Sequence, residues 1–512
     1  MKGRSENKVF LEQEPRFDDI MCSLRATGKQ PKGIIREMKQ VMAIARRFNE
    51  EVVRPNVDAL DLKMHADPDY LPWDFVKTAN QWGFYSMFIP KIFGGKGYSL
   101  SCIGYFMEEI GSACAAMANL IGVHYLGYVA LASAWNMRLA DHISRDVVKG
   151  EETGQPCLIS FAMTEPDAGT DSQNVEFMDI GNLACHARKV EGGYEVSGSK
   201  IFISNGHLST WHMLFAYTDL DKASENMVML AVKTGDKGFS FGKREKKMGQ
   251  KGSIASELIF QNCFVPDEYV LLDNWQIAGF KRSPRQINEQ ILANIWSASR
   301  MGVSAFGTGA ARGAFEQALR FARQTTVEGQ CLIHYEWCQS LLAEMYKNAA
   351  VARLTHFESG YANGLDGVAK ATNARLMYYL LKITPVSFFG VLARPFFKLP
   401  LATWLFRKIS FDGQSDEEID RIDGWGSLAK FVGTDAGMQN SRLAMELMGQ
   451  AGVRHDQRAE KITRDAKLYQ IYEGTNQINR INLFKRMIGR TCQGVPVFSP
   501  ECDCLTASHS MN

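Results

Sequence analysis

The chain has 512 residues, of which 46% are hydrophobic and 22% are charged, and its formal net charge is +2. This length and composition are typical of a globular protein with two or three domains, and the near-neutral charge excludes an electrostatic argument for nucleic-acid binding. The eleven cysteines include no CxxC pair, which favours reduced thiols over a disulfide framework. The polar N-terminus lacks the continuous apolar core of a signal peptide, so we expect a cytoplasmic protein.

The spacing of apolar residues and the positions of turn signals divide the chain into five parts. Residues 1–35 are expected to form a poorly structured extension. Apolar residues recur at helical spacing over 36–157, which predicts an N-terminal helical domain. Short apolar runs separated by turn signals predict a small β domain over 158–278. Helical spacing returns over 279–490, ahead of a tail at 491–512. Small residues there share one helical face, which we expect to pack closely on another helix: Gly302, Ala305, Gly309 and Gly313.

Three separate segments carry the most chemical information. Residues 161–171 read Phe-Ala-Met-Thr-Glu-Pro-Asp-Ala-Gly-Thr-Asp, residues 198–206 read Gly-Ser-Lys-Ile-Phe-Ile-Ser-Asn-Gly, and residues 468–480 read Leu-Tyr-Gln-Ile-Tyr-Glu-Gly-Thr-Asn-Gln-Ile-Asn-Arg. The third segment places Glu473 between an aromatic residue and a glycine. Apolar neighbours would raise the pKa of this carboxyl by desolvation, as a general base at neutral pH requires. An isolated Tyr-Glu-Gly is more commonly a helix-capping or salt-bridged glutamate, and the two other segments favour the catalytic interpretation.

In this order and at these separations, the three segments resemble the acyl-CoA dehydrogenase family of flavoproteins over roughly residues 36–490. The resemblance implies an α+β fold with an N-terminal helical domain, a middle β domain and a C-terminal four-helix bundle. It also implies FAD and the α,β-dehydrogenation of an acyl-CoA thioester to the trans-2-enoyl-CoA, with Glu473 as the base for the α-proton and the flavin as hydride acceptor. Electrons would pass to an electron-transfer flavoprotein or a membrane acceptor, and the enzyme would be a homodimer or homotetramer.

The resemblance also assigns the other site residues by position. The flavin contacts that it implies are Phe161, Met163, Thr164, Phe202, Ser204, Thr475 and Gln477. The substrate contacts are Thr170 at the pantetheine arm of CoA, Arg300 near the CoA moiety, Tyr472 in the acyl-pocket wall and Gly474 beside the backbone that binds the thioester carbonyl. Some subgroups carry their base at the position of Ser299, so Glu473 fits the majority arrangement.

Two stretches depart from the family pattern. Many relatives hold the FAD adenosine across the dimer interface with Arg-x-x-Phe-Gly followed by a glutamine, where this chain has Gln-Thr-Thr-Val-Glu-Gly at 324–329 and then Glu336. The usual Gln-x-x-Gly-Gly is replaced by Glu-Leu-Met-Gly-Gln at 446–450. Unpaired carboxylates near a pyrophosphate would repel it. We therefore expect FAD to bind more weakly at its adenine end, or through other contacts.

An insertion at residues 366–424 interrupts the resemblance. Its 376–411 portion is apolar and aromatic, contains no acidic residue, and has no apolar run of the ~20 residues that a membrane span requires. Its basic residues are Lys382, Arg394, Lys398, Arg407 and Lys408, and Pro385, Pro395 and Pro400 are expected to break any long helix. Two interpretations stay open: a hydrophobic hairpin packed on the protein's own surface or a subunit interface, or a peripheral membrane anchor on the inner face of the membrane.

Other functions also stay open. A flavin-dependent oxidase or monooxygenase would use the same fold, although monooxygenase relatives generally lack the carboxylate. A non-catalytic, membrane-associated scaffold would suit the altered adenine-binding stretch. Cys502 and Cys504 have no histidine pair nearby, so no metal site is predicted.

Overall fold

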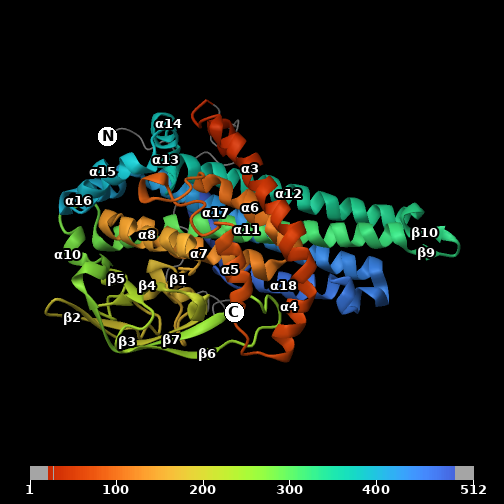
Figure 1. The fold of residues 1–512 in the computed structure, drawn as a ribbon, viewed down its shortest axis with the longest axis horizontal. Coiled ribbons are helices and arrows are strands. Elements are labelled where there is room, and N and C mark those ends of the chain that lie inside the picture. Colours follow the sequence, from red (N-terminus) through yellow and green to blue (C-terminus); the bar gives the residue numbers. More distant parts are fainter. Residues whose placement is uncertain (1–20, 27, 490–512) are drawn as a thin grey trace, which may run out of the picture.

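The computed structural model describes residues 21–26 and 28–489 (Figure 1). The predicted tail, Cys502, Cys504 and the first 20 residues of the predicted extension lie outside the described residues. The end of that extension is not poorly structured as predicted, because α2 (Cys22–Ala26) forms there. Its Cys22 is buried, and the guanidinium of Arg25 pairs with the carboxylate of Asp366 at 2.9 Å. This polar contact ties the segment to the C-terminal domain.

The N-terminal domain is helical, as its apolar spacing predicts. Its helices are α3 (Gly33–Phe48), α4 (Arg54–Ala66), α5 (Trp73–Gln81), α6 (Ile103–Ala113), α7 (Ala115–Ser133) and α8 (Met137–Thr153). Among the described helices, α7 alone is long and apolar enough by composition to cross a membrane, but 83% of its most apolar stretch is buried inside the fold. It is therefore the central helix of this domain, covered on all sides by neighbouring elements.

The described residues of the middle domain form an eight-stranded sheet with the order β6-β7-β3-β2-β4-β5-β8, in which β1 pairs in parallel with β4. The strands are β1 (Ile159–Ala162), β2 (His186–Val190), β3 (Gly193–Ser204), β4 (Trp211–Tyr217), β5 (Met227–Lys233), β6 (Phe239–Arg244), β7 (Ala255–Pro266) and β8 (Val270–Leu272), with the short helices α9 (Val175–Met178) and α10 (Asn274–Ile277) at the domain's borders. The amide of Ile201 donates to the carbonyl of Thr164 at 2.9 Å. The two segments expected to contact flavin therefore lie side by side.

The C-terminal domain is a bundle of long helices. It contains α11 (Pro284–Gln324), α12 (Glu336–Asp366), α17 (Asp416–Met448), α18 (Ala459–Tyr469) and α19 (Asn476–Leu483). The pair α11 and α12 projects to the right in Figure 1, where the hairpin β9 (Thr326–Val327) and β10 (Gln330–Cys331) forms its tip.

The predicted small-residue face is only partly a helix contact. A Cβ added at Gly309 would lie 2.6 Å from the carbonyl oxygen of Glu108, and one at Gly313 would meet the carbonyl of Ser112, so these glycines allow α11 to approach α6 closely. A Cβ at Gly302 would meet nothing within 4 Å, because Gly302 borders a cavity.

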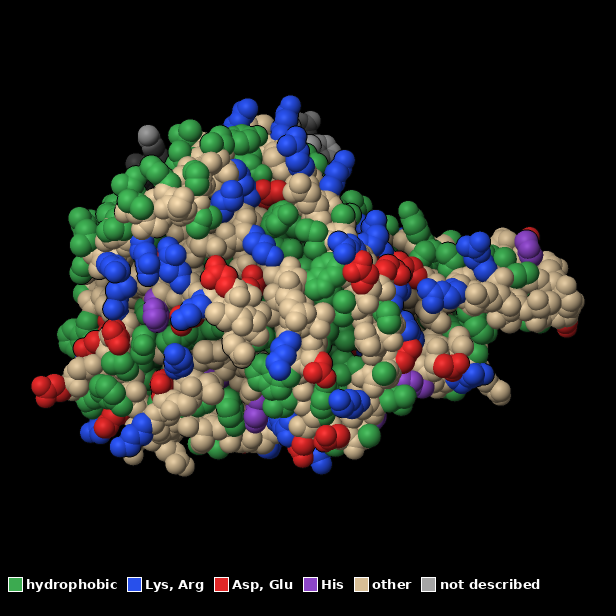
Figure 2. Space-filling model, viewed as in Figure 1, with side chains coloured by type: hydrophobic (Ala, Val, Ile, Leu, Met, Phe, Trp, Pro, Cys, Tyr) green, Lys and Arg blue, Asp and Glu red, His purple; other side chains and the backbone are tan. Residues whose placement is uncertain are grey.

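The insertion folds as α13 (Lys370–Asn373), α14 (Arg375–Ile383), α15 (Val386–Phe397) and α16 (Pro400–Gly413). We call α14–α16 the apolar platform. Pro385 and Pro400 separate its helices as predicted, whereas Pro395 lies inside α15 and does not end it. Hydrophobic side chains gather over the upper left of the molecule in Figure 2, where Figure 1 places α14–α16. The chain bends by 117° between α14 and α15, and only the two helices taken together are long and apolar enough by composition to cross a membrane.

Candidate active site

The loop that carries Glu473 connects α18 to α19 and has left-handed backbone. The φ angle is 59° at Glu473 and 77° at Gly474, a conformation that residues with a Cβ rarely adopt. Three side chains donate hydrogen bonds to the backbone carbonyls of this loop. Arg300 Nε donates to the carbonyl of Glu473 at 3.3 Å, Lys430 Nζ donates to the carbonyl of Gly474 at 2.7 Å, and Asn479 Nδ2 donates to the same carbonyl at 2.9 Å. Long-range hydrogen bonds therefore fix a backbone shape that local sequence disfavours.

The Glu473 loop faces a cavity of about 490 Å³ whose wall combines residues of the N-terminal helices, the sheet and the bundle. Most residues expected at the site line it: Phe161, Met163, Thr164, Thr170, Phe202, Ser204, Tyr472, Glu473, Gly474 and Thr475. The remaining wall is largely apolar, with Ile103, Met107, Val123, Leu126 and Met301 among its residues. A cavity of this kind suits a ligand with an apolar part and few polar anchors.

The carboxyl of Glu473 combines an unpaired oxygen with a shifted pKa. Its Oε2 is buried and has no hydrogen-bond partner among the described residues. Burial raises the pKa of Glu473 above its usual value, while a hydrogen bond from Ser299 and the charges of Arg300 and Lys430 act in the opposite direction. A carboxylate with a raised pKa and a free oxygen at a cavity is suited to accept a proton near neutral pH.

Family models match each of the three domains. The model described as "Acyl-CoA dehydrogenase, N-terminal domain" matches residues 36–150, the middle-domain model matches 160–263, and the C-terminal-domain model matches 290–376 and 412–488. This chain belongs to the acyl-CoA dehydrogenase family. The predicted family and fold class are thereby confirmed, and this acyl-CoA dehydrogenase is an FAD-dependent oxidoreductase that acts on acyl-CoA. Residues 377–411, the greater part of the platform, fall between the two matched segments of the C-terminal model.

Similar proteins differ in what they act on. The chain is 27% identical over 452 residues to cyclohex-1-ene-1-carbonyl-CoA dehydrogenase of Geobacter metallireducens, covering 88% of this chain and 97% of that protein. It is 26% identical over 457 residues to acryloyl-CoA reductase (NADH) of Anaerotignum propionicum, covering 89% and 96%. The structure of butyryl-CoA dehydrogenase from Megasphaera elsdenii superposes with a TM-score of 0.66 at 22% identity, covering 88% and 97%. The last comparison concerns the fold alone.

The cavity of this acyl-CoA dehydrogenase fits a flavin in two respects. A register shift between Lys200 and Ile203 bulges β3, and Phe202 within it has a φ of 57° and a side chain that is 55% exposed at the cavity. Such a bulge re-aims a side chain, and here it presents an uncovered aromatic ring. In addition, Oε1 of Gln173 is a buried cavity atom without a hydrogen-bond partner among the described residues. An aromatic face and a free polar atom are what a planar heterocycle would use.

Two residues assigned by resemblance do not line the cavity. Arg300 is buried, pairs with Asp423 at 2.8 Å and lies over the ring of Trp296, so it supports the Glu473 loop instead of reaching outward to CoA. Gln477 is exposed on the first turn of α19. Thr475, two residues earlier, caps that helix by accepting from the amide of Ile478 at 3.3 Å. Because this cap fixes where α19 begins, it also fixes the face of the helix on which Gln477 lies, and that face is exposed to solvent.

A buried ion pair that the sequence did not reveal supports the two segments expected to contact flavin. Lys200 Nζ donates to Glu165 Oε1 at 2.7 Å and to the carbonyl of Met163 at 2.9 Å, and both charged side chains are at most 1% exposed. The other oxygen of Glu165 accepts from the amides of Ala184 and Cys185. The pair therefore fixes the backbone that carries Met163 and its neighbour Thr164. Lys200 lies inside the informative 198–206 segment, which was its only signal.

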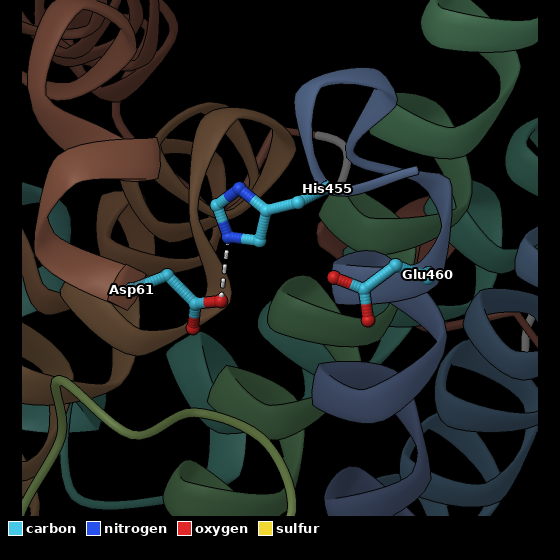
Figure 3. A group of neighbouring side chains, drawn as sticks. All are labelled: Asp61, His455 and Glu460. Atoms are coloured by element: carbon cyan, nitrogen blue, oxygen red, sulfur yellow. Dashed lines mark hydrogen bonds and ion pairs between the residues drawn. The ribbon is translucent and has the colours of Figure 1, made fainter. Parts of the chain in front are cut away.

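A group of possible metal ligands lies elsewhere. Figure 3 shows Asp61, His455 and Glu460 around a common space, with their ligand atoms within 4.8 Å of one another. Arg464 donates to Asp61 at 2.7 Å and to Glu460 at 2.7 Å. Burial acts to raise the pKa of Asp61, but the hydrogen bond from Arg464 and nearby cations hold it below its usual value. The guanidinium thus supplies the positive charge, and the group acts as an ion-pair network between α4 and α18.

Replacing Lys200 with Met tests the buried pair. The substitution leaves the carboxylate of Glu165 buried without its cation, so we expect a loss of about 3–5 kcal/mol in the free energy of unfolding and a lower FAD content. Denaturant unfolding and flavin absorbance measure the two effects. Lys189→Met is the control, because its pair with Asp267 is exposed and should contribute at most about 1 kcal/mol. Equal stability of the two variants would refute the assignment.

Proposed function

We propose that this enzyme catalyses the FAD-dependent α,β-dehydrogenation of an acyl-CoA thioester to the trans-2-enoyl-CoA, with Glu473 as the base. The observation that carries the proposal is the free Oε2 of Glu473 at the cavity, on a carboxyl whose pKa is raised by burial. Glu473 takes the α-proton of the thioester. The bound FAD supplies the acceptor for the β-hydride, so the substrate loses two electrons and two hydrogens and the cofactor gains the electrons.

Substrate positioning falls to residues near the same loop. We assign the pantetheine arm to Thr170, the acyl-pocket wall to Tyr472, and the thioester carbonyl to the backbone N–H of Glu473, which would stabilise developing enolate charge as an oxyanion hole does. A Cβ at Gly474 would lie 2.9 Å from Ile478 Cγ2, so the loop has room only for glycine. On the flavin side the proposed contacts are Phe161, Met163, Thr164, Phe202, Ser204 and Thr475, all at the cavity.

The position of the residues expected near the adenine end of FAD supports a proposal about how subunits assemble. Residues 324–329 and Glu336 do not line the cavity; they lie at the tip of α11 and α12, which projects away from the body (Figure 1). This tip would reach the cofactor of a neighbouring subunit, in a homodimer or homotetramer. An electron-transfer flavoprotein or a membrane acceptor would reoxidise the flavin, and a position at the inner face of the membrane remains a prediction.

The alternatives differ in measurable ways. An oxidase or monooxygenase would consume oxygen in step with substrate, whereas a dehydrogenase needs an added electron acceptor. A non-catalytic scaffold would bind no flavin, and the cavity residues described above favour the enzyme.

Glu473→Gln tests the base. The amide cannot accept the α-proton, so we expect flavin reduction by acyl-CoA to slow by at least about 10²-fold while FAD stays bound. An anaerobic titration with a panel of acyl-CoA thioesters, followed by the loss of flavin absorbance, measures this and identifies the preferred chain. Glu191→Gln, an exposed carboxylate in the turn between β2 and β3, is the control and should leave the rate unchanged. A Glu473→Gln enzyme that still reduces flavin at the wild-type rate would exclude this base.

Lys430 is a positioning residue whose replacement should shift the pH profile. Burial, and then the charge of Arg300, lower its pKa to about 7, and its charge lowers the pKa of Glu473. The rate of flavin reduction rises with pH as Glu473 loses its proton. Lys430→Met removes a cation that favours the carboxylate, so the profile should move to higher pH.

The measurement is the rate of flavin reduction as a function of pH in Lys430→Met, with Lys430→Arg as the variant that keeps the charge. The other charged groups that face Lys430 are Glu473, Asp435 and Arg480, and they are unchanged in both variants. Lower rates with an unmoved pH profile in Lys430→Met would mean that Lys430 supports only the fold.

A further inference from the structure

No element among residues 21–26 and 28–489 covers the outer face of the apolar platform. Leu376 is 84% exposed, Ile383 is 80% exposed and Val391 is 73% exposed. Other large hydrophobic side chains of the platform are also exposed: Met377, Tyr379, Leu380, Val386, Phe388, Leu392, Leu399, Leu401, Trp404, Leu405 and Ile409. An apolar surface that extends over three helices is more than the scattered exposure expected of a protein surface, and marks a place of contact.

The inner face of the platform, by contrast, is fixed to the body. Arg407 is buried, donates to the carbonyl of Ala134 at 3.1 Å and to Gln276 Oε1 at 2.8 Å, and also reaches the carbonyl of Leu271. The ring of Phe397 packs on Phe93 with centroids 5.4 Å apart. These contacts fix the orientation of the platform, so its outer face points away from the body of the protein.

Charge on the platform is almost entirely positive: Asp412, near the end of α16, is its one acidic residue, and it pairs with Lys408. Residues 367–411 contain no Asp or Glu. Lys382, Arg394 and Lys408 pair with carboxylates of neighbouring residues. Arg375 and Lys398 are exposed and make no ion pair with any residue that the structure describes. The apolar face is thus accompanied by free positive charge.

A lipid surface fits this combination better than a second copy of the chain. In a two-fold pairing the same face meets itself, which would bring like charges together. Anionic head groups would instead attract Arg375 and Lys398, while Trp404 and Tyr379 are residues that favour the boundary between head groups and acyl chains. The longest platform helix, α16, has 14 residues and spans about 21 Å, less than the ~30 Å hydrocarbon core. The helices α14 and α15 are long enough only together, and the chain bends by 117° between them. The platform would lie on the bilayer and not cross it.

We infer that the platform docks the enzyme onto a bilayer that contains anionic lipid, with the side chains of α14–α16 inserted at the interface. This inference does not depend on the identity of the base or on the acyl chain that the enzyme uses, so it can fail or succeed independently of the proposed reaction.

The first experiment measures co-sedimentation of the full-length FAD-loaded protein with vesicles. Vesicles of phosphatidylcholine alone are compared with vesicles that also contain phosphatidylglycerol. We expect binding to the mixed vesicles that weakens as salt increases. The double variant Leu401→Ser and Ile409→Ser should bind at least about tenfold more weakly, because it removes apolar area from the inserted face.

Matched controls come from the same chain. Leu62→Ser with Ile180→Ser removes two aliphatic side chains that are 55% and 63% exposed, close to the 60% and 62% of Leu401 and Ile409. This pair should bind vesicles like the wild type. Arg375→Gln with Lys398→Gln should lose the preference for phosphatidylglycerol, whereas the exposed pair Lys77→Gln with Lys222→Gln should keep it. All four double variants should reduce flavin at the wild-type rate.

Tryptophan fluorescence gives a second test of membrane docking. Trp404 is 52% exposed on the platform and Trp337 is 50% exposed on α12, away from the platform. Brominated lipid should quench the fluorescence of the wild type and of Trp337→Phe, and quench Trp404→Phe less. Absence of binding to both vesicle types would overturn the inference, as would equal losses in the Leu401/Ile409 and Leu62/Ile180 variants. Lipid-free self-association that the Leu401/Ile409 variant abolishes, without vesicle binding, would assign the face to a second copy.

Discussion

Arg300 and Lys430 carry positive charge into the interior of the bundle, and the shape of the Glu473 loop depends on them. A buried charge is costly unless it is paired, and the two cations are compensated differently. Arg300 is paired with Asp423, which also accepts from Arg486 at 2.9 Å. Among the described residues, Lys430 donates only to neutral acceptors, the carbonyl of Gly474 and Oδ1 of Asn476. Burial lowers the pKa of both cations, and lowers that of Lys430 to about 7. A guanidinium keeps its charge despite such a shift, so Arg300 is a fixed support, whereas Lys430 is the cation through which we expect pH to act on the loop.

On the flavin side of the cavity, a buried ion also supports the backbone. Lys200 and Glu165 form a buried pair whose remaining hydrogen bonds all go to backbone groups. Each side of the site therefore consists of an irregular backbone segment supported by a buried ion from another element. Because such ions tolerate little displacement, the cavity residues between them are held at fixed separation before any ligand binds.

The family resemblance, carried by three short segments, predicted the parts of the site that are contiguous in the chain. Residues from all three segments line the cavity: Phe161, Met163, Thr164, Thr170, Phe202, Ser204 and Tyr472 to Thr475. The supports were not predicted, since Arg300 and Asp423 are 123 residues apart and no local pattern joins them. Gln477 lies outside the cavity because the cap at Thr475 fixes where α19 begins, and two residues along a helix change the face, so its contact with FAD stays a prediction. The three-domain order followed directly from apolar spacing.

The stretch of chain just before the platform forms part of the cavity wall. Asn363, Val368 and Ala369 line the cavity and lie in the stretch that leads from α12 into the insertion. Asn363 also accepts from Ser297 at 2.9 Å, which ties this stretch to α11 beside Trp296. A bilayer that holds the platform would therefore hold one wall of the acyl site near the membrane surface. If the platform docks as inferred, the apolar chain of a long acyl-CoA would favour the same interface, while its anionic head would be repelled by the anionic lipid and would stay on the aqueous side.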